Sequence, residues 1–326
     1  MSQPVPLAPP RTLIDLEVDG SPVRVPQGDT ILTACRTQGV DTPTLCYGEN
    51  LTPQNACRVC VVEVEGARTL VPACSRVAEP GMKVRTDTER VQHSRRLVME
   101  LLASSVEMDL TSPDVHRWMD EYEVRPERFG AVMDDLPAGE RDARDPGHHH
   151  VTGDPTVAEG VQQPVKIDNE LYVRDYSRCI LCYKCVEACG EDAQNTFAIA
   201  VAGRGFDARI STEHAVPLPE SACVYCGNCI GVCPTGALMA KTEYDMRAEG
   251  TWDPAAQTVT STICPYCGVG CVVDLHVQDE RILKVTSPLD SSVTGGHLCV
   301  KGRFGFEFVN ERPRPDGVAD VATSGE

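Results

Sequence analysis

Several features that define common protein classes are scarce or missing in this sequence. Aromatic side chains make up only 5% of its 326 residues, so the core has to come from aliphatic residues or from something other than side chains. Residues 1–18 lack the basic and apolar regions of a signal peptide. No apolar run approaches the ~18 residues that a membrane span needs. We therefore expect a cytoplasmic protein with no membrane span.

Positive charge is scarce as well. The formal net charge is −18, and the sequence shows no basic patch of the kind that recognises nucleic acid. We therefore expect no nucleic-acid partner. The acidity suits a soluble component of a larger assembly, although many ordinary soluble proteins are equally acidic.

Cysteine, by contrast, is abundant. The chain has 17 cysteines, an odd number that a fully paired disulfide framework would not produce. In a cytosolic protein, a high cysteine content indicates metal binding or catalysis before it indicates disulfides. Metal binding is therefore the favoured interpretation.

Local patterns predict a small mixed sheet folded over one helix in the first 90 residues. Strands are predicted, from alternating apolar residues and flanking turns, at 13–18, 22–26, 59–66 and 82–86. Asp29 or Thr30 can cap a helix through 31–38, and Gly39 suits the left-handed position that ends it.

Helices are predicted after this sheet. Residues 88–104 carry apolar side chains at helical spacing. These are Val91, Leu97, Val98, Leu101 and Leu102. Ser112-Pro113 is typical of a helix cap followed by the first helical position, which predicts a short helix around Trp118.

A linker is predicted at 136–164, where the chain is rich in Pro, Gly, Asp and His and shows no periodicity. His148, His149 and His150 lie in this stretch. Adjacent histidines can bind metal, but no cysteine is nearby. An exposed linker segment is therefore the favoured interpretation.

One internal repeat carries eight of the cysteines. "CILCYKCVEAC" at 179–189 matches "CVYCGNCIGVC" at 223–233, and both have the spacing C-x2-C-x2-C-x3-C. This is the bacterial ferredoxin spacing, in which the fourth cysteine of each run ligates the other [4Fe–4S] cluster. The predicted ligand sets are Cys179, Cys182, Cys185 and Cys233 for one cluster, and Cys223, Cys226, Cys229 and Cys189 for the other.

The two runs differ at the position that follows the fourth cysteine. Pro234 stands there in the second run and Gly190 in the first, a departure that removes no ligand. A pair of zinc knuckles is the alternative interpretation. Zinc would use four ligands in C-x2-C pairs and leave spare cysteines, so it is disfavoured.

Four further cysteines near the N-terminus have the spacing C-x10-C-x2-C-x13-C. They are Cys46, Cys57, Cys60 and Cys74. This differs from the plant-type ferredoxin spacing, so the spacing alone leaves both a zinc site and a [2Fe–2S] cluster open. Cys35, on the apolar face of the predicted helix at 30–38, is expected to be a buried free cysteine that behaves as a small hydrophobic residue.

The last cysteine group has the spacing C-x2-C-x3-C-x27-C. Its members are Cys264, Cys267, Cys271 and Cys299. Gly268 and Gly270 would let the backbone fold tightly around a third [4Fe–4S] cluster. Lys301 lies two residues past the fourth cysteine and could direct a cation from that cluster toward a neighbour, although such a lysine is more often a surface residue.

Two segments resemble known iron–sulfur proteins. "PTLCYGENLTPQNACRVCVVEVEG…LVPAC" resembles the [2Fe–2S] domain that begins the large iron–sulfur subunits of NADH dehydrogenase, iron-only hydrogenase and NAD-linked formate dehydrogenase. The ferredoxin pair follows in the same order in all three. "CPYCGVGC…HLCVKGRFGFEFV" resembles the first segment of the molybdopterin domain of formate dehydrogenase alpha subunits. The resemblance covers roughly residues 12–310, and it implies a [2Fe–2S] cluster on the N-terminal cysteines.

Two departures from these families bear on function. The NADH dehydrogenase and hydrogenase relatives carry a His-x3-Cys-x2-Cys-x5-Cys cluster after the long helix, whereas the matching "LLASSVEMDLTSPDV" has no cysteine. This favours the formate dehydrogenase branch. Family alpha subunits also continue for several hundred residues that hold the metal cofactor, whereas this chain ends with "NERPRPDGVADVATSGE".

We therefore expect a split or truncated alpha subunit. Three arrangements stay open. The catalytic portion is a separate polypeptide that docks near Lys301, the chain is a fragment or frameshifted product, or it is an electron-transfer module for another partner.

The resemblance implies an electron relay in which this chain carries no catalytic residue. In the family, formate oxidation at a molybdenum or tungsten bis-pterin site releases electrons that clusters carry singly to a flavin subunit, which reduces NAD. The expected cofactors are one [2Fe–2S] and three [4Fe–4S] clusters, with the bis-pterin on a partner or missing portion. Lys301 would relay electrons toward the pterin. The expected partners are a molybdopterin polypeptide, a flavin/NAD-binding subunit and a small [2Fe–2S] subunit.

Two alternative functions are kept. One is an electron-transfer subunit of an NADH dehydrogenase or of a hydrogenase diaphorase module. The other, of a different class, is a structural scaffold that binds zinc.

The expected fold is modular α+β, with a β-grasp ferredoxin domain, a helical connector, a two-cluster ferredoxin domain and a small β-rich domain of the molybdopterin oxidoreductase type. The predicted boundaries are 11–90 for the [2Fe–2S] domain, 91–135 for the connector, 136–165 for the linker, 166–248 for the two-cluster domain, 257–312 for the β-rich [4Fe–4S] domain and 313–326 for a polar tail.

Overall fold

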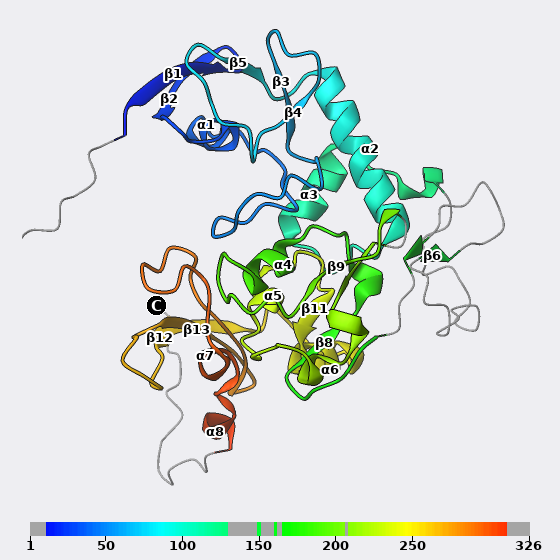
Figure 1. The fold of residues 1–326 in the computed structure, drawn as a ribbon, viewed down its shortest axis with the longest axis vertical. Coiled ribbons are helices and arrows are strands. Elements are labelled where there is room, and N and C mark those ends of the chain that lie inside the picture. The colour runs from blue at the N-terminus through cyan, green and yellow to red at the C-terminus, as the bar shows by residue number, and fades with distance from the viewer. Residues whose placement is uncertain (1–10, 130–148, 151–159, 162–164, 206–207, 312–326) are drawn as a thin grey trace, which may run out of the picture.

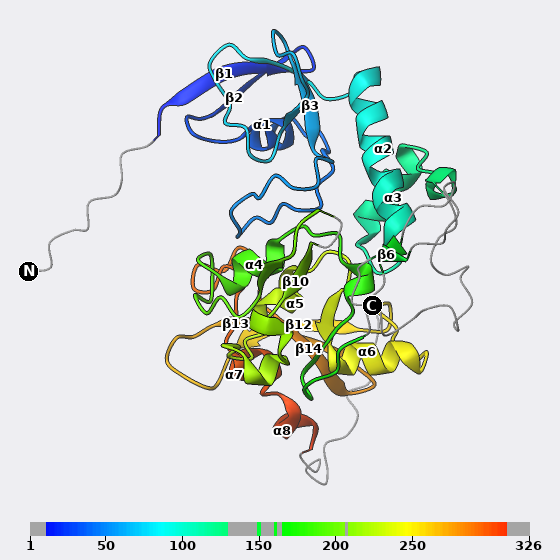
Figure 2. The same ribbon diagram turned by 45° about the vertical axis from the view of Figure 1, so that its right-hand side comes forward.

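The computed structural model describes residues 11–129, 149–150, 160–161, 165–205 and 208–311. An N-terminal unit (residues 11–85) lies at one end of the molecule and a C-terminal unit (residues 257–311) at the other. A central unit (residues 165–248) lies between them, as Figure 1 and Figure 2 show from two directions. None of the helices in the described ranges is both long enough and apolar enough to span a bilayer.

The N-terminal unit is a five-stranded sheet with one helix packed on it. Its strands are β1 Leu13–Val18, β2 Ser21–Pro26, β3 Val61–Val64, β4 Val71–Pro72 and β5 Lys83–Arg85. Their order is β2-β1-β5-β3-β4, with β1 parallel to β5 and the other neighbours antiparallel. Helix α1, Ile31–Thr37, begins at Thr30, whose hydroxyl accepts a hydrogen bond from the Thr33 N–H. The predicted mixed sheet over one helix is confirmed, although the sequence did not predict β4.

The core of this unit follows from the alternation in β1. Ile14, Leu16 and Val18 are buried against the helix residues Ile31 and Cys35. Cys35 has no exposed surface, and burial raises the pKa of its thiol. The prediction of a buried, apolar-like free cysteine is confirmed.

Two helices follow the sheet, as predicted. They and a short 3-10 turn are α2 Glu89–Ser105, α3 Pro113–Glu121 and η1 Pro126–Phe129. The predicted apolar face of α2 is partly wrong, because Leu101 is 46% exposed whereas Arg95 and Glu100 are 2% and 0% exposed.

Hydrogen bonds explain why α2 buries two charged residues. The Arg95 guanidinium donates to the Val61 carbonyl at 3.2 and 2.9 Å and to the Tyr122 hydroxyl at 2.7 Å. The Glu100 carboxylate accepts from Arg128 at 3.1 and 2.9 Å. Burial of a polar group is tolerated when such partners replace water, and the long Arg stem adds apolar contact.

The central unit is built from short elements. They are β8 Tyr172–Arg174, η3 Tyr176–Arg178, α4 Lys184–Cys189, β9 Ala200–Ala202, β10 Arg209–Ser211, η5 Glu213–Ala215, η6 Leu218–Glu220, α5 Asn228–Val232, β11 Leu238–Ala240 and α6 Lys241–Ala248. Strand β8 pairs antiparallel with β11, and β9 pairs antiparallel with β10. Helices α4 and α5 begin inside the two cysteine runs and lie close together.

The two cysteine runs share one backbone conformation. In the first run, Leu181 and Tyr183 have φ of 51° and 65°. In the second, the equivalent Tyr225 and Gly227 have φ of 57° and 69°. The sequence repeat is therefore also a repeat of the left-handed positions that turn the chain around each cysteine loop.

The C-terminal unit is a three-stranded antiparallel sheet with two one-turn helices. Its elements are β12 Thr258–Ile263, β13 Val272–Gln278, β14 Arg281–Thr286, α7 Val300–Phe304 and α8 Glu307–Asn310. The strand order is β12-β13-β14. Cys264, Val273, Val285 and Leu298 belong to its small buried core.

The predicted linker and the polar tail fall largely or wholly outside the described residues, and His148 does so too. Within the linker, β6 His149–His150 pairs antiparallel with β7 Gly160–Val161. The structure therefore contains a short strand pair where the sequence predicted no regular element.

One loop of the N-terminal unit, here called the bracing loop (residues 48–54), contacts both other units. The Asn50 side-chain amide donates to the Gly295 carbonyl of the C-terminal unit at 2.7 Å. The Thr52 N–H and hydroxyl donate to the Asp192 carboxylate of the central unit at 2.6 and 2.9 Å. These contacts tie the three units together directly.

Candidate metal centres

The N-terminal group consists of Cys46, Cys57, Cys60 and Cys74. Cys46 and Cys57 lie on the long loop after α1, while Cys60 and Cys74 adjoin β3 and β4. Hydrogen bonds from the Cys57 and Cys74 thiols lower the pKa of Cys46 to about 2, and Cys74 lowers the pKa of Cys60 to about 7. The Cys57 N–H also donates to the Cys46 Sγ at 3.5 Å. The four thiols thus interact with one another, and two of them favour the thiolate form that binds metals.

The first central group consists of Cys179, Cys182, Cys185 and Cys233. Cys185 interacts electrostatically with the other three, and Cys233 also interacts with Cys179 and Cys182. Burial raises the pKa of Cys179 and that of Cys182 to about 12. The cysteine from the second run therefore joins three from the first, in a site from which water is largely excluded.

The second central group consists of Cys189, Cys223, Cys226 and Cys229. Cys229 interacts electrostatically with the other three, and Cys226 also interacts with Cys189 and Cys223. Burial is the main cause that raises the pKa of both Cys226 and Cys229. Cys189 of the first run thus lies with three cysteines of the second run, just as Cys233 of the second run lies with three of the first.

Hydrogen bonds reach the sulfur atoms of the second central group. The Ala198 N–H donates to Cys189 Sγ at 3.2 Å, and the Tyr225 N–H donates to Cys223 Sγ at 3.4 Å. The Tyr172 hydroxyl lies 3.0 Å from the same Cys223 Sγ. Burial raises the pKa of Tyr172, so its hydroxyl keeps the proton that it would donate to a thiolate.

The C-terminal group consists of Cys264, Cys267, Cys271 and Cys299. Cys271 interacts electrostatically with the other three, and its pKa is raised, chiefly by burial. The Cys264 N–H donates to the Cys271 carbonyl at 2.8 Å, and Gly270 has a φ of 71°, so the loop closes on itself. Cys267 and Cys299 are exposed, in contrast to the cysteines of the central groups.

Lys301 lies on the one-turn helix α7, which begins directly after Cys299. Its side chain is exposed. The lysine is thus near the most exposed cysteine group and free of the protein interior.

The four groups form a series along the molecule. Cys182 interacts electrostatically with Cys46, which brings the first central group next to the N-terminal group. Cys185 interacts with Cys229, which joins the two central groups. The second central group meets the C-terminal unit, because the Arg303 Nε on α7 donates to the Cys226 carbonyl at 3.0 Å.

Within the described ranges, no three His, Cys, Asp or Glu side chains converge closely enough to hold a single metal ion. The groups are therefore defined by electrostatic interactions and hydrogen bonds between thiols, with sulfur as the common donor. Thiolates are the soft ligands that select iron–sulfur clusters, zinc or copper(I).

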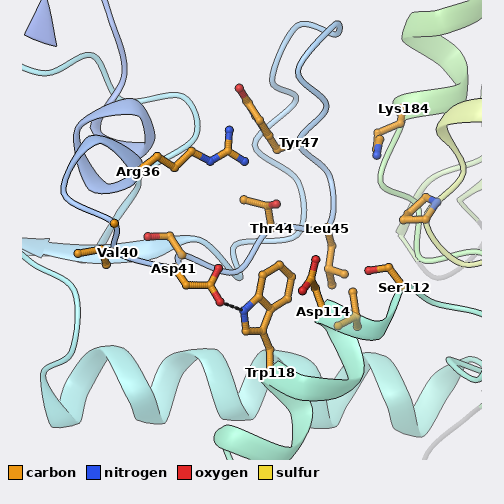
Figure 3. A pocket seen from close by; sticks show the side chains of 14 residues that line it. Arg36, Val40, Asp41, Thr44, Leu45, Tyr47, Ser112, Asp114, Trp118 and Lys184 are labelled. Atoms are coloured by element: carbon orange, nitrogen blue, oxygen red, sulfur yellow. Dashed lines mark hydrogen bonds between the residues drawn. The ribbon is translucent and has the colours of Figure 1, made fainter. Parts of the chain in front are cut away.

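A cavity of about 520 Å³ lies where the N-terminal unit, α3 and the central unit meet (Figure 3). Arg36, Asp41, Trp118 and Lys184 are among the residues that line it. The Trp118 indole N–H donates to the Asp41 carboxylate at 2.8 Å, the contact that is dashed in Figure 3. Lys184 adjoins the ligand candidate Cys185, so the cavity lies beside the first central group. Its lining contains neither cysteine nor histidine, and we assign no metal to it.

Sequence reasoning missed three residues that contact these groups. Tyr172 approaches Cys223 from β8, which is separated from it by about fifty residues. Arg303 and Asn228 meet between the C-terminal and central units. The sequence "VKGRF" contains both Lys301 and Arg303, and only Lys301 was predicted to have a role. The structure distinguishes the two residues, because Lys301 is exposed and Arg303 is buried.

Three parts of the chain match known domain families. Residues 11–89 match a 2Fe-2S iron-sulfur cluster binding domain. Residues 170–239 match the ferredoxin-like domain of NADH-quinone oxidoreductase subunit 3, and residues 257–311 match the molybdopterin oxidoreductase Fe4S4 domain.

Longer relatives align with nearly the whole chain. The NADPH-Fe(3+) oxidoreductase subunit alpha of Geobacter sulfurreducens is 31% identical over 320 residues, which is 96% of this chain and 33% of the relative. The G 2 subunit of the Rhizobium meliloti NADH-quinone oxidoreductase is 34% identical over 302 residues, which is 93% of this chain and 32% of the relative. A Staphylococcus haemolyticus protein, provisionally named a formate dehydrogenase, is 26% identical over 338 residues, which is 91% of this chain and 31% of the relative. The chain spans about a third of the length of these relatives.

One solved structure has a similar fold. A chain of the NAD+-reducing [NiFe]-hydrogenase in its H2-reduced state superposes with a TM-score of 0.54 at 22% identity, covering 70% of this chain and 87% of that one. Three parts of this chain thus match iron–sulfur domain families, and the longer proteins that it resembles are named as subunits of NADPH-Fe(3+) oxidoreductase and NADH-quinone oxidoreductase and as a formate dehydrogenase.

Proposed function

We propose that the four cysteine groups hold one [2Fe–2S] and three [4Fe–4S] clusters. The N-terminal group would hold the two-iron cluster and each of the other groups a four-iron cluster. The donor chemistry supports this, since every member is a thiol and backbone N–H groups point at sulfur in two of the groups. Such N–H···S bonds are a usual means of tuning protein-bound clusters.

The chain would serve as the electron-transfer part of a multi-subunit oxidoreductase. Clusters of this kind supply one-electron transfer when bound. The observation that carries the proposal is the series of four neighbouring cysteine groups that runs from one end of the molecule to the other. The protein's own contribution is to hold each group at a fixed place and to control its burial.

Formate is the substrate that we propose for the complete complex. Two sequence features support it: the absence of cysteine from "LLASSVEMDLTSPDV", and the segment "CPYCGVGC…HLCVKGRFGFEFV" with Lys301. NADH or NADPH oxidation, or a hydrogenase diaphorase module, is the second candidate. The identities of 31% and 34% to proteins named for NADPH and NADH chemistry favour it.

A catalytic polypeptide or domain with a molybdenum or tungsten pterin would dock on the C-terminal unit, with Lys301 as the relay toward the pterin. Several large apolar side chains of this unit are more than half exposed, namely Val259, Ile263, Val269, Leu289 and Val293. Ile263 and Val269 lie close to cysteines of the least buried group in the sequence, and exposed apolar side chains there suit such docking. At the other end of the series, the N-terminal group would face the flavin/NAD-binding and small [2Fe–2S] subunits.

Elemental analysis of the natively and anaerobically purified complex tests this proposal. Full occupancy of all sites predicts about fourteen iron atoms per chain, from one two-iron and three four-iron clusters. About one molybdenum or tungsten atom, together with bleaching of the visible absorption by formate, would support the formate assignment. Bleaching by NADH or NADPH without either metal would support the second candidate. A colourless sample with about four zinc ions would contradict both and leave the structural scaffold.

A further inference from the structure

The guanidinium of Arg303 is buried at the contact between the central and C-terminal units. The residue is only 5% exposed. It donates to the Cys226 carbonyl at 3.0 Å, to the Asn228 side-chain oxygen at 3.1 Å and to the Val285 carbonyl at 3.4 Å. All three acceptors are uncharged, and no ion pair to Arg303 is found in the described part of the chain.

An arginine remains charged in proteins, and a buried charge without a counter-charge is costly. Burial lowers the pKa of Arg303, and the nearby thiols of Cys229 and Cys226 act in the opposite direction. Arg303 contacts the backbone of Cys226 in the second central group, so a cluster bound to that group would place its negative charge beside this cation.

The second cysteine run is shaped to admit this side chain. A Cβ atom on Gly227, whose φ is 69°, would collide with the Arg303 stem and approach the Phe304 ring to 2.9 Å. A Cβ atom on Gly231 would come within 3.3 Å of the guanidinium. The Phe304 ring in turn lies 6.2 Å from the ring of Tyr172, which contacts Cys223. Two glycines and two aromatic rings thus frame the arginine against the cysteine group.

We propose that Arg303 is the fixed counter-charge of the cluster in the second central group, and that it makes this cluster easier to reduce than it would be without the arginine. The inference rests on the proposed ligand assignment. Each added electron makes a cluster more negative, and a buried cation nearby stabilises the reduced form most where the dielectric is low. Arg303 is contributed by the C-terminal unit, so docking of that unit would set the potential at the point where the two units meet.

The variant Asn228→Asp tests the proposal with little structural change. The Asn228 side-chain oxygen accepts hydrogen bonds from Arg303 and from the Leu298 N–H at 2.9 Å, and a carboxylate accepts both. Its negative charge would neutralise the guanidinium. At a fixed ambient potential, we expect about a tenfold lower reduced-to-oxidised ratio for one four-iron cluster, equal to a shift of about 59 mV to lower potential. Potentiometric titration of the purified complex, followed by electron paramagnetic resonance, measures it.

Three comparisons make the result decisive. Arg303→Gln should shift the same cluster in the same direction, and Arg303→Lys should keep it within about threefold of wild type, since the positive charge is retained. Arg281→Gln removes an exposed guanidinium from β14 of the same unit and should shift no cluster. The [2Fe–2S] signal provides an internal reference.

Retention of full iron with an unchanged potential in Asn228→Asp would overturn the proposal while leaving the cluster assignment intact. Loss of the same cluster in Arg303→Lys and Arg303→Gln alike would also overturn it, because the role would then be purely structural. A wild-type complex without four-iron signals would instead contradict the proposed function.

Discussion

The cysteine sulfur atoms of the second central group have hydrogen-bond partners of two kinds. The backbone N–H groups of Ala198 and Tyr225 donate to sulfur, and the hydroxyls of Tyr172 and Thr196 lie 3.0 and 3.3 Å from Cys223 Sγ and Cys189 Sγ. A hydrogen bond withdraws negative charge from sulfur, so it favours the reduced state of a bound cluster. The backbone donors are fixed by the fold, whereas a hydroxyl can be removed by a single substitution.

The variant Tyr172→Phe is expected to lower the potential of this cluster. Loss of one hydrogen bond of about 1 kcal/mol corresponds to about 40 mV for a one-electron couple. The ring itself, and its packing near Phe304, would remain. A redox titration followed by electron paramagnetic resonance measures the shift.

Tyr225→Phe is the matched control. It removes a hydroxyl from the same cluster loop but keeps the backbone N–H bond to Cys223. The potential should therefore stay within about 10 mV of wild type, well below the shift of about 40 mV expected for the loss of one hydrogen bond. Equal shifts in both variants would mean that the Tyr172 hydroxyl has no special role.

The sequence predicted which cysteines would be neighbours but not which other residues would touch them. Cysteine spacing within a run fixes local distances, and the crossed exchange between runs follows from the repeat. The sets that interact in the structure are the predicted sets, while ligation itself stays a prediction. Tyr172, Asn228 and Arg303 carry no such local pattern, because their contacts with the second run depend on how distant segments dock.

At the scale of elements, helix α2 shows how a polar contact can override an apolar pattern. Its limits were predicted from periodicity alone, and in the structure the Thr88 hydroxyl caps its N-terminus by accepting a hydrogen bond from the Val91 N–H. Its buried face was predicted less well. The Val61 carbonyl of β3 needs donors, and the Arg95 guanidinium supplies them, so the helix rotates a charged residue inward and leaves Leu101 at the surface.

Replacement of Arg95 by alanine is expected to loosen α2 from β3. The change removes three hydrogen bonds, leaves the Val61 carbonyl poorly satisfied and opens space in the interior. We expect the free energy of unfolding of the N-terminal part to fall by about 3 kcal/mol. Denaturant titration of cluster-loaded protein, followed by circular dichroism, measures the free energy of the unfolding transition that includes α2.

Arg90→Ala on the same helix is the control. The Arg90 side chain is 51% exposed and its ion pair with Glu63 is 3.9 Å long. Such an exposed pair contributes about 0.5 kcal/mol or less. A comparable loss in both variants would show that the cost comes from helix content and not from the buried contact.

At the scale of the whole molecule, the order of the units was predictable and their docking was not. Motifs and repeats are local, so they reveal each unit in turn. The contact between Asn50 and Gly295 joins residues that lie 245 positions apart, and nothing in either neighbourhood indicates the other. The same holds for the burial of Arg303 against the second cysteine run.

Gly227→Ala should separate the C-terminal unit from the central unit. An alanine at a φ of 69° carries about 1–2 kcal/mol of backbone strain, and its Cβ would collide with Arg303 and Phe304. We expect faster proteolysis within residues 249–256, which connect the two units, and a lower melting temperature. Limited proteolysis under anaerobic conditions measures the first effect.

Gly81→Ala isolates the contribution of strain. Gly81 has a φ of 74° but no atom within 4 Å of the position that a Cβ would take, so the variant has the strain without the collision. Cleavage within 249–256 should then match wild type. If Gly227→Ala also matches wild type there, the contact through α7 does not hold the units together.

The bracing loop has a consequence for the speed of the proposed relay. Electron tunnelling slows exponentially as the distance between centres increases. If the units moved on hinges, the rate of electron transfer would therefore vary between fast and slow. The loop bonds to Asp192 of the central unit and to Gly295 of the C-terminal unit, so each of the three units is held by contacts with the other two. No unit can then move without breaking one of these contacts, and thermal motion would leave the distances between the centres almost constant.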